Sequence, residues 1–234
     1  MTFLHDVTQR HHSPRWHQLT FAARGHLEVL TADARRLVPA DRAVWVPAGT
    51  EHTNIMRAPV SMRSLFVAVG AIDNAADRVR TIAVTRLLRE LIQHITRLGA
   101  LDSTHAEQAR LAGVLFDLLA AAEDVPLDLP SPRDPRARRF SDLVTQKPGD
   151  GVSIAQLARR AGASLRTLER VFLAETGVPV GEWRRRVRLF HALRLLEAGG
   201  SVTDVALDVG YDSTSAFCQA FRRQFGHSPK RRRA

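Results

Sequence analysis

The most evident chemistry in this sequence belongs to the arginines of its C-terminal half. Four of them form a cluster in one short stretch: Arg184, Arg185, Arg186 and Arg188. Guanidinium groups bind phosphate oxygens through several donors at once. Residues 133–234 hold 20 basic and 10 acidic side chains, whereas residues 1–132 hold 14 of each, so the net charge of +10 lies downstream. A basic run is often only a solvated surface, but an excess confined to one half predicts that this half binds a polyanion.

The arginine cluster lies between two copies of one residue pattern. The first copy runs Ser153, Ile154, Leu157, Ala158, Gly162, Ser164, Leu168, Phe172 and Gly177. The second runs Ser201, Val202, Val205, Ala206, Gly210, Ser213, Phe217, Phe221 and Gly226, shifted by 48 residues before the turn and by 49 after it. Each copy predicts a short helix, a turn at glycine and a second helix capped by serine.

In each predicted second helix, the apolar positions leave a polar face. Leu168 and Phe172 are four residues apart and predict a buried stripe, which leaves Arg166, Thr167, Glu169 and Arg170 on other faces. The second copy leaves Thr214, Ser215, Ala216 and Gln219. An all-helical bundle with this spacing from packing alone is the alternative. Two copies in tandem, joined by a longer helix between Pro179 and Gly199 that carries the arginine cluster, favour DNA binding.

Residues 137–229 resemble the DNA-binding domain of the AraC/XylS family of bacterial transcription regulators, most specifically from Gly210 through Phe217 to Pro229. The resemblance implies two helix-turn-helix units on successive major-groove segments. It implies that the following residues contact bases: Arg166, Glu169, Arg170, Thr214, Ser215, Ala216 and Gln219. Thr167, on the polar face of the first recognition helix, and Arg185, a phosphate contact from the arginine cluster, are the further predicted DNA contacts. Gln219 departs from the family, where arginine is frequent, and glutamine pairs with adenine. The tail Lys230–Arg233 replaces the usual aromatic-containing ending and would add phosphate contacts, the alternative being a disordered tail.

The N-terminal half predicts short strands followed by two helices. Strand patterns occur at Leu19 and Phe21, at Gly25 to Val29, at Ala43–Val46 and at Met62–Val69, which predicts a small β-barrel or sandwich. Apolar residues in a 4-3-4-3 spacing predict the first helix: Val84, Leu88, Leu91, Ile95 and Leu98. Residues 111–119 predict the second, antiparallel to it. We expect the first seam to form a homodimer, and the alternative is that it packs on its own barrel.

The segment Val46–Asn54 resembles the second motif of the cupins, and His12 occupies the place of the first histidine of their first motif. Pro14 stands where cupins have a second histidine, and Gln18 stands where they have glutamate. A firmly held metal needs three or four ligands, and His17 is the remaining substitute. The sequence therefore predicts no bound metal. A divalent ion held by the histidines is the alternative. The expected ligand pocket contains His12, His17, Trp45 and His52, unless local hydrogen bonds satisfy these histidines.

The sequence as a whole predicts an α+β protein of two domains. A cupin-like β-barrel with two appended helices covers residues 1–124, a proline-rich linker covers 125–135, and an all-α domain with tandem helix-turn-helix units covers 136–234. The single cysteine, Cys218, excludes an internal disulfide. Because no apolar run reaches the roughly 18 residues that a membrane helix needs, and the first residues lack a signal peptide's core, we expect a cytoplasmic protein without a membrane partner.

The predicted function is that of a one-component transcription regulator. It would bind double-stranded DNA in a sequence-specific way, respond to a small-molecule effector and act as a homodimer, with RNA polymerase as a further candidate partner. No catalytic residue and no cofactor are assigned. A metal-dependent cupin enzyme with a helical appendage is the alternative from another class, and a nonspecific architectural DNA-binding protein is the third.

Overall fold

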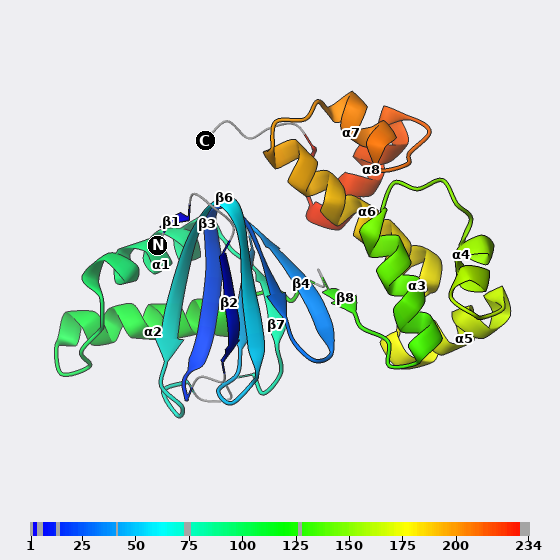
Figure 1. Ribbon diagram of the computed structural model, residues 1–234. Coiled ribbons are helices and arrows are strands. Elements are labelled where there is room, and N and C mark those ends of the chain that lie inside the picture. The colour runs from blue at the N-terminus through cyan, green and yellow to red at the C-terminus, as the bar shows by residue number, and fades with distance from the viewer. Residues whose placement is uncertain are drawn as a thin grey trace. The chain divides into compact units, whose positions relative to one another are not determined.

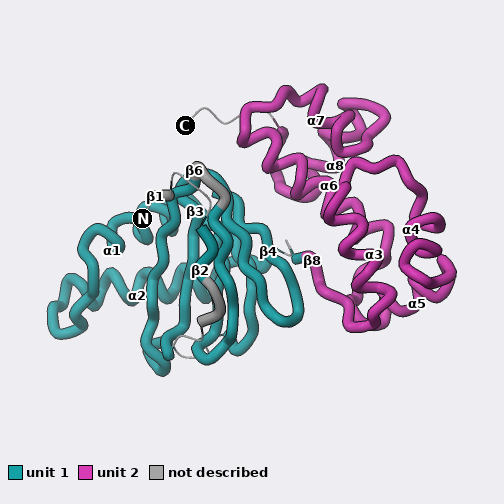
Figure 2. Tube along the Cα trace, in the orientation of Figure 1, with its two compact units in different colours: residues 1–128 teal, residues 129–234 magenta. Residues whose placement is uncertain are grey.

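The computed structural model describes residues 2–3, 7–12, 15–40, 42–72, 76–125 and 128–229. It divides into an N-terminal unit, residues 1–128, and a C-terminal unit, residues 129–234 (Figure 2). The N-terminal unit is an antiparallel sheet with helices α1 and α2, and the C-terminal unit is helical (Figure 1). This arrangement confirms the expected mixed class, with strands first and helices second. The short strand β8 (Asp128–Pro130) spans the division.

The N-terminal sheet is built around a ladder of two long strands, β3 and β6. The strands before β8 are β1 (Thr2–Phe3), β2 (Val7–His12), β3 (His17–Leu30), β4 (Ala34–Pro39), β5 (Arg42–Val46), β6 (His52–Val67) and β7 (Arg80–Ala83). β3 and β6 pair antiparallel from His17 opposite Val67 to Leu30 opposite Thr53. The first half of β3 also pairs with β5 and its second half with β4. The sheet therefore depends on the β3–β6 ladder.

The sequence does not predict strands β1, β2, β4 and β7, and β6 begins at His52 rather than at Met62. β3 is continuous where the sequence predicts two strands parted at Gly25, because this glycine has φ +73° inside an irregular stretch of the ladder rather than in a turn. β4 was not expected, since Arg35 and Arg36 make it look polar. Arg36 is only 3% exposed, and its guanidinium lies 3.0 Å from the carboxylate of Asp33 and 3.5 Å from that of Asp128.

The two faces of the sheet carry separate apolar cores. One face buries Ala22, Leu27, Val44 and Met56 among themselves and their neighbours. The other packs against α1 (Arg86–Leu98) and α2 (Ala106–Ala120). The residues of the 4-3-4-3 seam that join this second core are Val84, Leu88, Leu91 and Ile95. Four of the five side chains of the seam thus pack on their own sheet, whereas Leu98 is 49% exposed. Dimerisation stays a prediction.

The C-terminal unit contains two helix pairs with matching boundaries. Its helices are α3 (Pro135–Gln146), α4 (Ile154–Arg160), α5 (Leu165–Thr176), α6 (Val180–Glu197), α7 (Val202–Asp208) and α8 (Thr214–Phe225). The side chains of the four expected serines cap the paired helices: Ser153, Ser164, Ser201 and Ser213. Within the part of the chain that is described, no helix is long and apolar enough to span a lipid bilayer.

The turns of the two pairs are closed by equivalent hydrogen bonds. The backbone N–H of Ala163 donates to the carbonyl of Ala158 at 2.9 Å, and the N–H of Tyr211 donates to that of Ala206 at 2.9 Å. Gly162 and Gly210 precede these donors with φ +84° and +80°, a region that side chains with a Cβ rarely adopt. The internal repeat of the sequence is therefore a repeat of local structure.

Helix α6 contributes to an aromatic cluster in each half of the C-terminal unit. Trp183 packs edge-on against Phe172 of α5, with ring centroids 5.4 Å apart, and Phe172 in turn meets Phe140 of α3. Further along α6, Phe190 lies 6.3 Å from Phe225 of α8. Each pair of helices thus has its own core, and α6 joins the two.

Helix α3 was not expected from the sequence, although its start carries a local signal. Asp134 caps it by accepting from the backbone N–H groups of Arg136 and Ala137, and Pro135 occupies the first helical position. Its side chains Ala137, Phe140 and Val144 are buried. They complete the core on which α4 and α5 rest.

The loop before α4 packs against the turn that follows α7. Arg188 of α6 donates to the carbonyls of Pro148 at 3.1 Å, Asp150 at 3.2 Å and Gly210 at 3.2 Å. Gly149 lies so close to this turn that a Cβ atom on it would be 1.8 Å from the carbonyl oxygen of Asp208. One guanidinium therefore joins the two helix pairs, and the contact requires glycine at position 149.

Replacing Gly149 with alanine is expected to destabilise the C-terminal unit. The new methyl group must displace backbone rather than a flexible side chain, which costs on the order of 1–3 kcal/mol. Urea unfolding followed by far-ultraviolet circular dichroism measures the change in the free energy of unfolding. Gly151→Ala is the matched control, because nothing lies within 4 Å of its Cβ position. Equal unfolding midpoints for the two variants would contradict the close packing.

Candidate nucleic-acid interface

Helix α5 buries one side and presents the other to solvent. Its N-terminus is fixed by Ser164, whose hydroxyl accepts from the N–H of Thr167 at 3.1 Å. Leu168 and Phe172 are 1% and 0% exposed, as their spacing predicts. The remaining site residues of this helix divide by exposure: Arg166, Glu169 and Arg170 are exposed, and Thr167 is half-buried with its hydroxyl 2.9 Å from that of Ser164.

Helix α8 repeats this arrangement with smaller side chains. Ser213 accepts from the N–H of Ala216 at 3.2 Å, and Phe217 and Phe221 are buried. The positions between them divide as in α5: Ser215, Ala216 and Gln219 are exposed, and Thr214 is half-buried. The structure thus brings three exposed positions on each helix to the side opposite the core.

The exposed face of α8 continues beyond the residues that the sequence argument selected. Arg222 and Arg223 lie exposed in the last turn. Arg222 follows Gln219 by three residues and Ser215 by seven, so the three side chains share a face of the helix. The same spacing rule, applied to the sequence, would have found this arginine.

The arginine cluster of α6 is less exposed to solvent than its sequence suggests. Arg184 is 9% exposed and donates to the carbonyl of Asp150 at 2.6 Å. Burial, with the positive charge of Arg188 nearby, lowers the pKa of the Arg184 guanidinium. Arg185 and Arg186 both bond to Glu182. The reason for the difference is that two cores pack on α6 and leave little of its circumference to water. Arg185 retains 41% of its side-chain exposure.

Three of the four expected pocket residues of the N-terminal unit are engaged with the protein itself. Trp45 is 4% exposed and donates from its indole N–H to the carbonyl of Ala76 at 3.0 Å. His17 stacks on Trp45 and accepts from the N–H of Ala48 at 3.2 Å. His52 is fully buried, with Nδ1 2.9 Å from the carbonyl oxygen of Thr50 and Nε2 3.0 Å from Oε1 of Gln18.

None of these histidines lines the cavity found in this unit, although Gln18, the partner of His52, does. This cavity therefore gives no support to a pocket formed by them, and local hydrogen bonds engage the ring nitrogens of His52 and Nδ1 of His17. The side chain of His12 lies outside the described part of the structure. Among the described residues, no group of three or more His, Cys, Asp or Glu side chains is placed to hold a metal ion. The tail Lys230–Arg233 also lies outside the described residues.

Known transcription regulators are similar to both units of the chain. Residues 157–234 match a family described as a helix-turn-helix domain. The HTH-type transcriptional regulator NimR of Escherichia coli (strain K12) is 31% identical over 226 residues, which are 97% of this chain and 82% of NimR. The HTH-type transcriptional regulator RipA of Corynebacterium glutamicum is 40% identical over 101 residues, which are 43% of this chain and 30% of RipA.

Among solved structures, the chain is similar to the DNA-binding domain of AdpA in complex with a target DNA. The identity is 36%, the match covers 41% of this chain and 86% of that domain, and the TM-score is 0.38. The similarity to NimR extends over nearly the whole chain, and the relatives named here are transcription regulators rather than enzymes. The chain belongs to the AraC/XylS family of DNA-binding transcription regulators.

Proposed function

We propose that the pairs α4–α5 and α7–α8 are tandem helix-turn-helix units whose second helices enter two successive segments of the major groove. The observation that carries this proposal is the equivalence of α5 and α8: each has a serine cap and a buried apolar stripe, and each exposes polar side chains opposite it. The proposed DNA contacts are Arg166, Thr167, Glu169, Arg170, Thr214, Ser215, Ala216, Gln219 and Arg185. Arg222 joins them from the face that it shares with Gln219.

The chemistry of the two faces differs. Arg166 and Arg170 are four residues apart on α5 and can each pair with O6 and N7 of a guanine, while Glu169 can accept from cytosine N4. On α8, Gln219 suits N6 and N7 of adenine, and Ala216 offers a methyl group to thymine. We therefore expect the segment read by α5 to be richer in G·C pairs than the segment read by α8.

Arg185 can bind a DNA phosphate only if its ion pair with Glu182 is replaced by one with the phosphate. It is paired with Glu182, and its side chain is 41% exposed. Partly exposed ion pairs contribute little, typically about 0–1 kcal/mol. A DNA phosphate can therefore replace the carboxylate at small cost, which makes Arg185 a positioning contact without base preference.

The N-terminal unit is proposed to be a cupin-like effector and dimerisation domain of a cytoplasmic regulator, with RNA polymerase as a candidate partner. Support for dimerisation comes from apolar side chains left exposed on its helices: Leu87 at 60%, Leu98 at 49% and Val114 at 44%. Leu87 and Leu98 are eleven residues apart, three turns of α1, and so share a face. The family relationship gives no support to the cupin enzyme alternative.

Arg170→Ala is expected to weaken a selected DNA site by about 1–3 kcal/mol and to relax discrimination at one position. Arg185→Ala should weaken all sequences alike and reduce the dependence of affinity on salt. Fluorescence anisotropy with selected and shuffled duplexes at several salt concentrations measures both effects. Arg86→Ala is the control, an exposed arginine on α1. If Arg170→Ala and Arg86→Ala had the same effect, the assignment of α5 would be lost.

Arg188→Met is expected to loosen the spacing between the two reading helices. It removes the three hydrogen bonds that join the loop before α4 to the turn after α7, each worth about 0.5–1.5 kcal/mol. We expect the preference for the native spacing over a site with one inserted base pair to fall. Competition binding with both sites measures this ratio, and Arg188→Lys should restore part of it. A fall in affinity with an unchanged ratio would argue against a positioning role.

Leu87→Glu combined with Leu98→Glu is expected to produce monomers. Each leucine withdrawn from an apolar interface costs about 1.5–3 kcal/mol, so the dimer dissociation constant should rise by at least about tenfold. Sedimentation over a range of protein concentrations measures the change. Leu207→Glu, at a leucine 61% exposed in the C-terminal unit, is the control. A wild-type chain that stays monomeric at every concentration would rule this surface out.

A further inference from the structure

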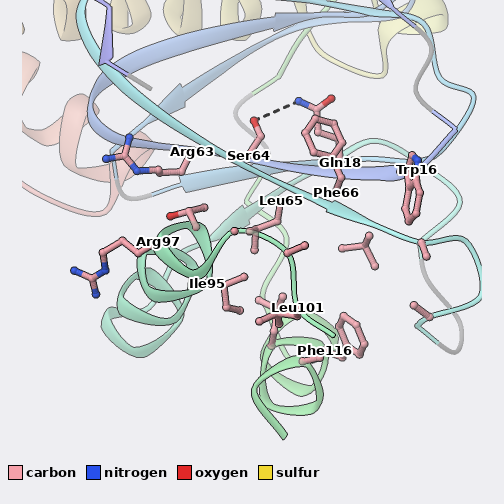
Figure 3. Close-up of a pocket in the computed structure, with 18 of the residues that line it drawn as sticks. Trp16, Gln18, Arg63, Ser64, Leu65, Phe66, Ile95, Arg97, Leu101 and Phe116 are labelled. Carbon is pink, nitrogen blue, oxygen red and sulfur yellow. Dashed lines mark hydrogen bonds between the residues drawn. The ribbon is translucent and has the colours of Figure 1, made fainter. Parts of the chain in front are cut away.

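A cavity of about 1590 Å³ lies in the N-terminal unit where β6 runs past α1 and α2 (Figure 3). Its walls are the last part of β6, the end of α1, one face of α2 and the loop that joins these helices. Pockets for small molecules usually measure about 300–1,000 Å³. The cavity is therefore large enough for an organic ligand without any rearrangement of the chain.

Most of the lining is apolar. The floor contains Leu65, Ile95 and Leu115, which are 7%, 3% and 3% exposed and belong to the core between sheet and helices. Two aromatic side chains of the lining are left open, Trp16 at 51% and Phe66 at 57% exposure. Exposed aromatic surface beside a cavity favours a ligand with an apolar or aromatic body.

A second wall of the lining, on the opposite face of β6 from Leu65, carries neutral polar side chains that are already held in place. Gln18 is 1% exposed, and its amide nitrogen donates to the hydroxyl of Thr20 at 2.7 Å and to that of Ser64 at 3.5 Å (Figure 3). Its carbonyl oxygen lies 3.0 Å from Nε2 of His52. This wall gives hydrogen-bonding capacity without charge.

The charge of the lining has one sign. Among the described residues, it includes Arg63 and Arg97 and contains no aspartate, glutamate, lysine or histidine. Arg63 is tethered by hydrogen bonds from Nη1 to the Ser61 hydroxyl and the Met62 carbonyl, both at 3.0 Å. The guanidinium of Arg97 forms no hydrogen bond or ion pair with any described residue. Both arginines lie at one end of the cavity, apart from Trp16 and Phe116 (Figure 3).

The carboxylate next to this lining in the sequence does not neutralise it. Asp102 follows Leu101, but its carboxylate accepts from the backbone N–H and the hydroxyl of Thr104 at 2.9 and 2.7 Å and lies 3.2 Å from His105. These groups hold it within its own loop. Asp102 is therefore not paired with Arg63 or Arg97.

We propose that this cavity binds a small organic anion, an aryl or alkyl carboxylate whose apolar body lies among the aromatic side chains and whose carboxylate meets Arg63 and Arg97. Carboxylates match the donor geometry of guanidinium groups, and such bonds are roughly twice as strong as neutral ones. The inference rests on the proposed effector role of the N-terminal unit and deepens it by naming the site and the ligand class.

The test uses three probes that share one body and differ in charge: 4-phenylbutanoate, 4-phenylbutanamide and 4-phenylbutan-1-amine. The full chain is titrated with each, by calorimetry and by tryptophan fluorescence, since Trp16 lines the cavity. We expect the carboxylate to bind about tenfold or more tightly than the amine, with the amide between them. Equal affinities for the three, or no binding of any at millimolar concentration, would overturn the proposal.

Variants locate the site and its charges. Arg97→Gln and Arg63→Gln should each weaken the carboxylate about three- to tenfold and leave the amide unchanged. Arg86→Gln is the matched control, because Arg86 is exposed on the same helix and does not line the cavity. Ala112→Trp should block the carboxylate and the amide alike, since Ala112 faces the cavity from α2. Unchanged carboxylate affinity in Arg97→Gln together with Arg63→Gln would place the anion elsewhere and overturn the proposal.

The site and the regulatory role are separated by a DNA measurement. Affinity for a selected duplex is measured with and without saturating 4-phenylbutanoate. Charge-ordered binding of the probes with unchanged DNA affinity supports the site and contradicts an effector role for this ligand class. Loss of the charge order with intact DNA binding contradicts the site and leaves the DNA-binding function standing.

Discussion

The contact of Arg188 with three backbone carbonyls is the constraint on which the C-terminal unit depends. Each helix pair has its own aromatic core, so neither needs the other in order to fold its turn. What the separate cores do not fix is the placement of one pair against the other. Helix α6 contributes a core residue to each helix pair. The hydrogen bonds of Arg188 and the close contact of Gly149 with Asp208 form the joint between the two pairs. Two helices can read successive groove segments only if their separation matches the DNA, so this joint bears directly on specificity.

The same constraint decides which arginines are left for DNA. On α6, Arg184 and Arg188 serve the joint, and Glu182 holds Arg185 and Arg186. The number of arginines on α6 is therefore larger than the number that are available to bind phosphates. The exposed arginines of α5 and of the last turn of α8 do not take part in these contacts, because they lie opposite the cores. This supports the proposal that the two repeated helices recognise DNA.

How far the sequence could predict this protein depends on the range of the interactions. The repeat was predictable because serine caps, turn glycines and apolar spacing act within a few residues. Strand β4 could not be predicted, because the partners of its arginines lie far along the chain. The roles of Arg184 and Arg188 could not be predicted either, because their partners are backbone carbonyls, which carry no sequence signal. His52 shows the limit at a site: its motif was recognised, but its hydrogen bond to Gln18, which excludes it from the cavity lining, is a tertiary fact.

Helices α1 and α2 have two roles in the N-terminal unit that compete for the same residues. Their inner faces pack on the sheet, and at the end of β6 they also wall the cavity. Leu98, proposed for the dimer surface, lies between Arg97 and Gly99, both of which line that cavity. A ligand controls a regulator only through different affinities for two of its states. Because cavity wall and proposed dimer surface meet in the last turn of one helix, a ligand that repositions Arg97 also repositions Leu98. The proposed effector binding and the proposed dimerisation would then be coupled within the N-terminal unit itself.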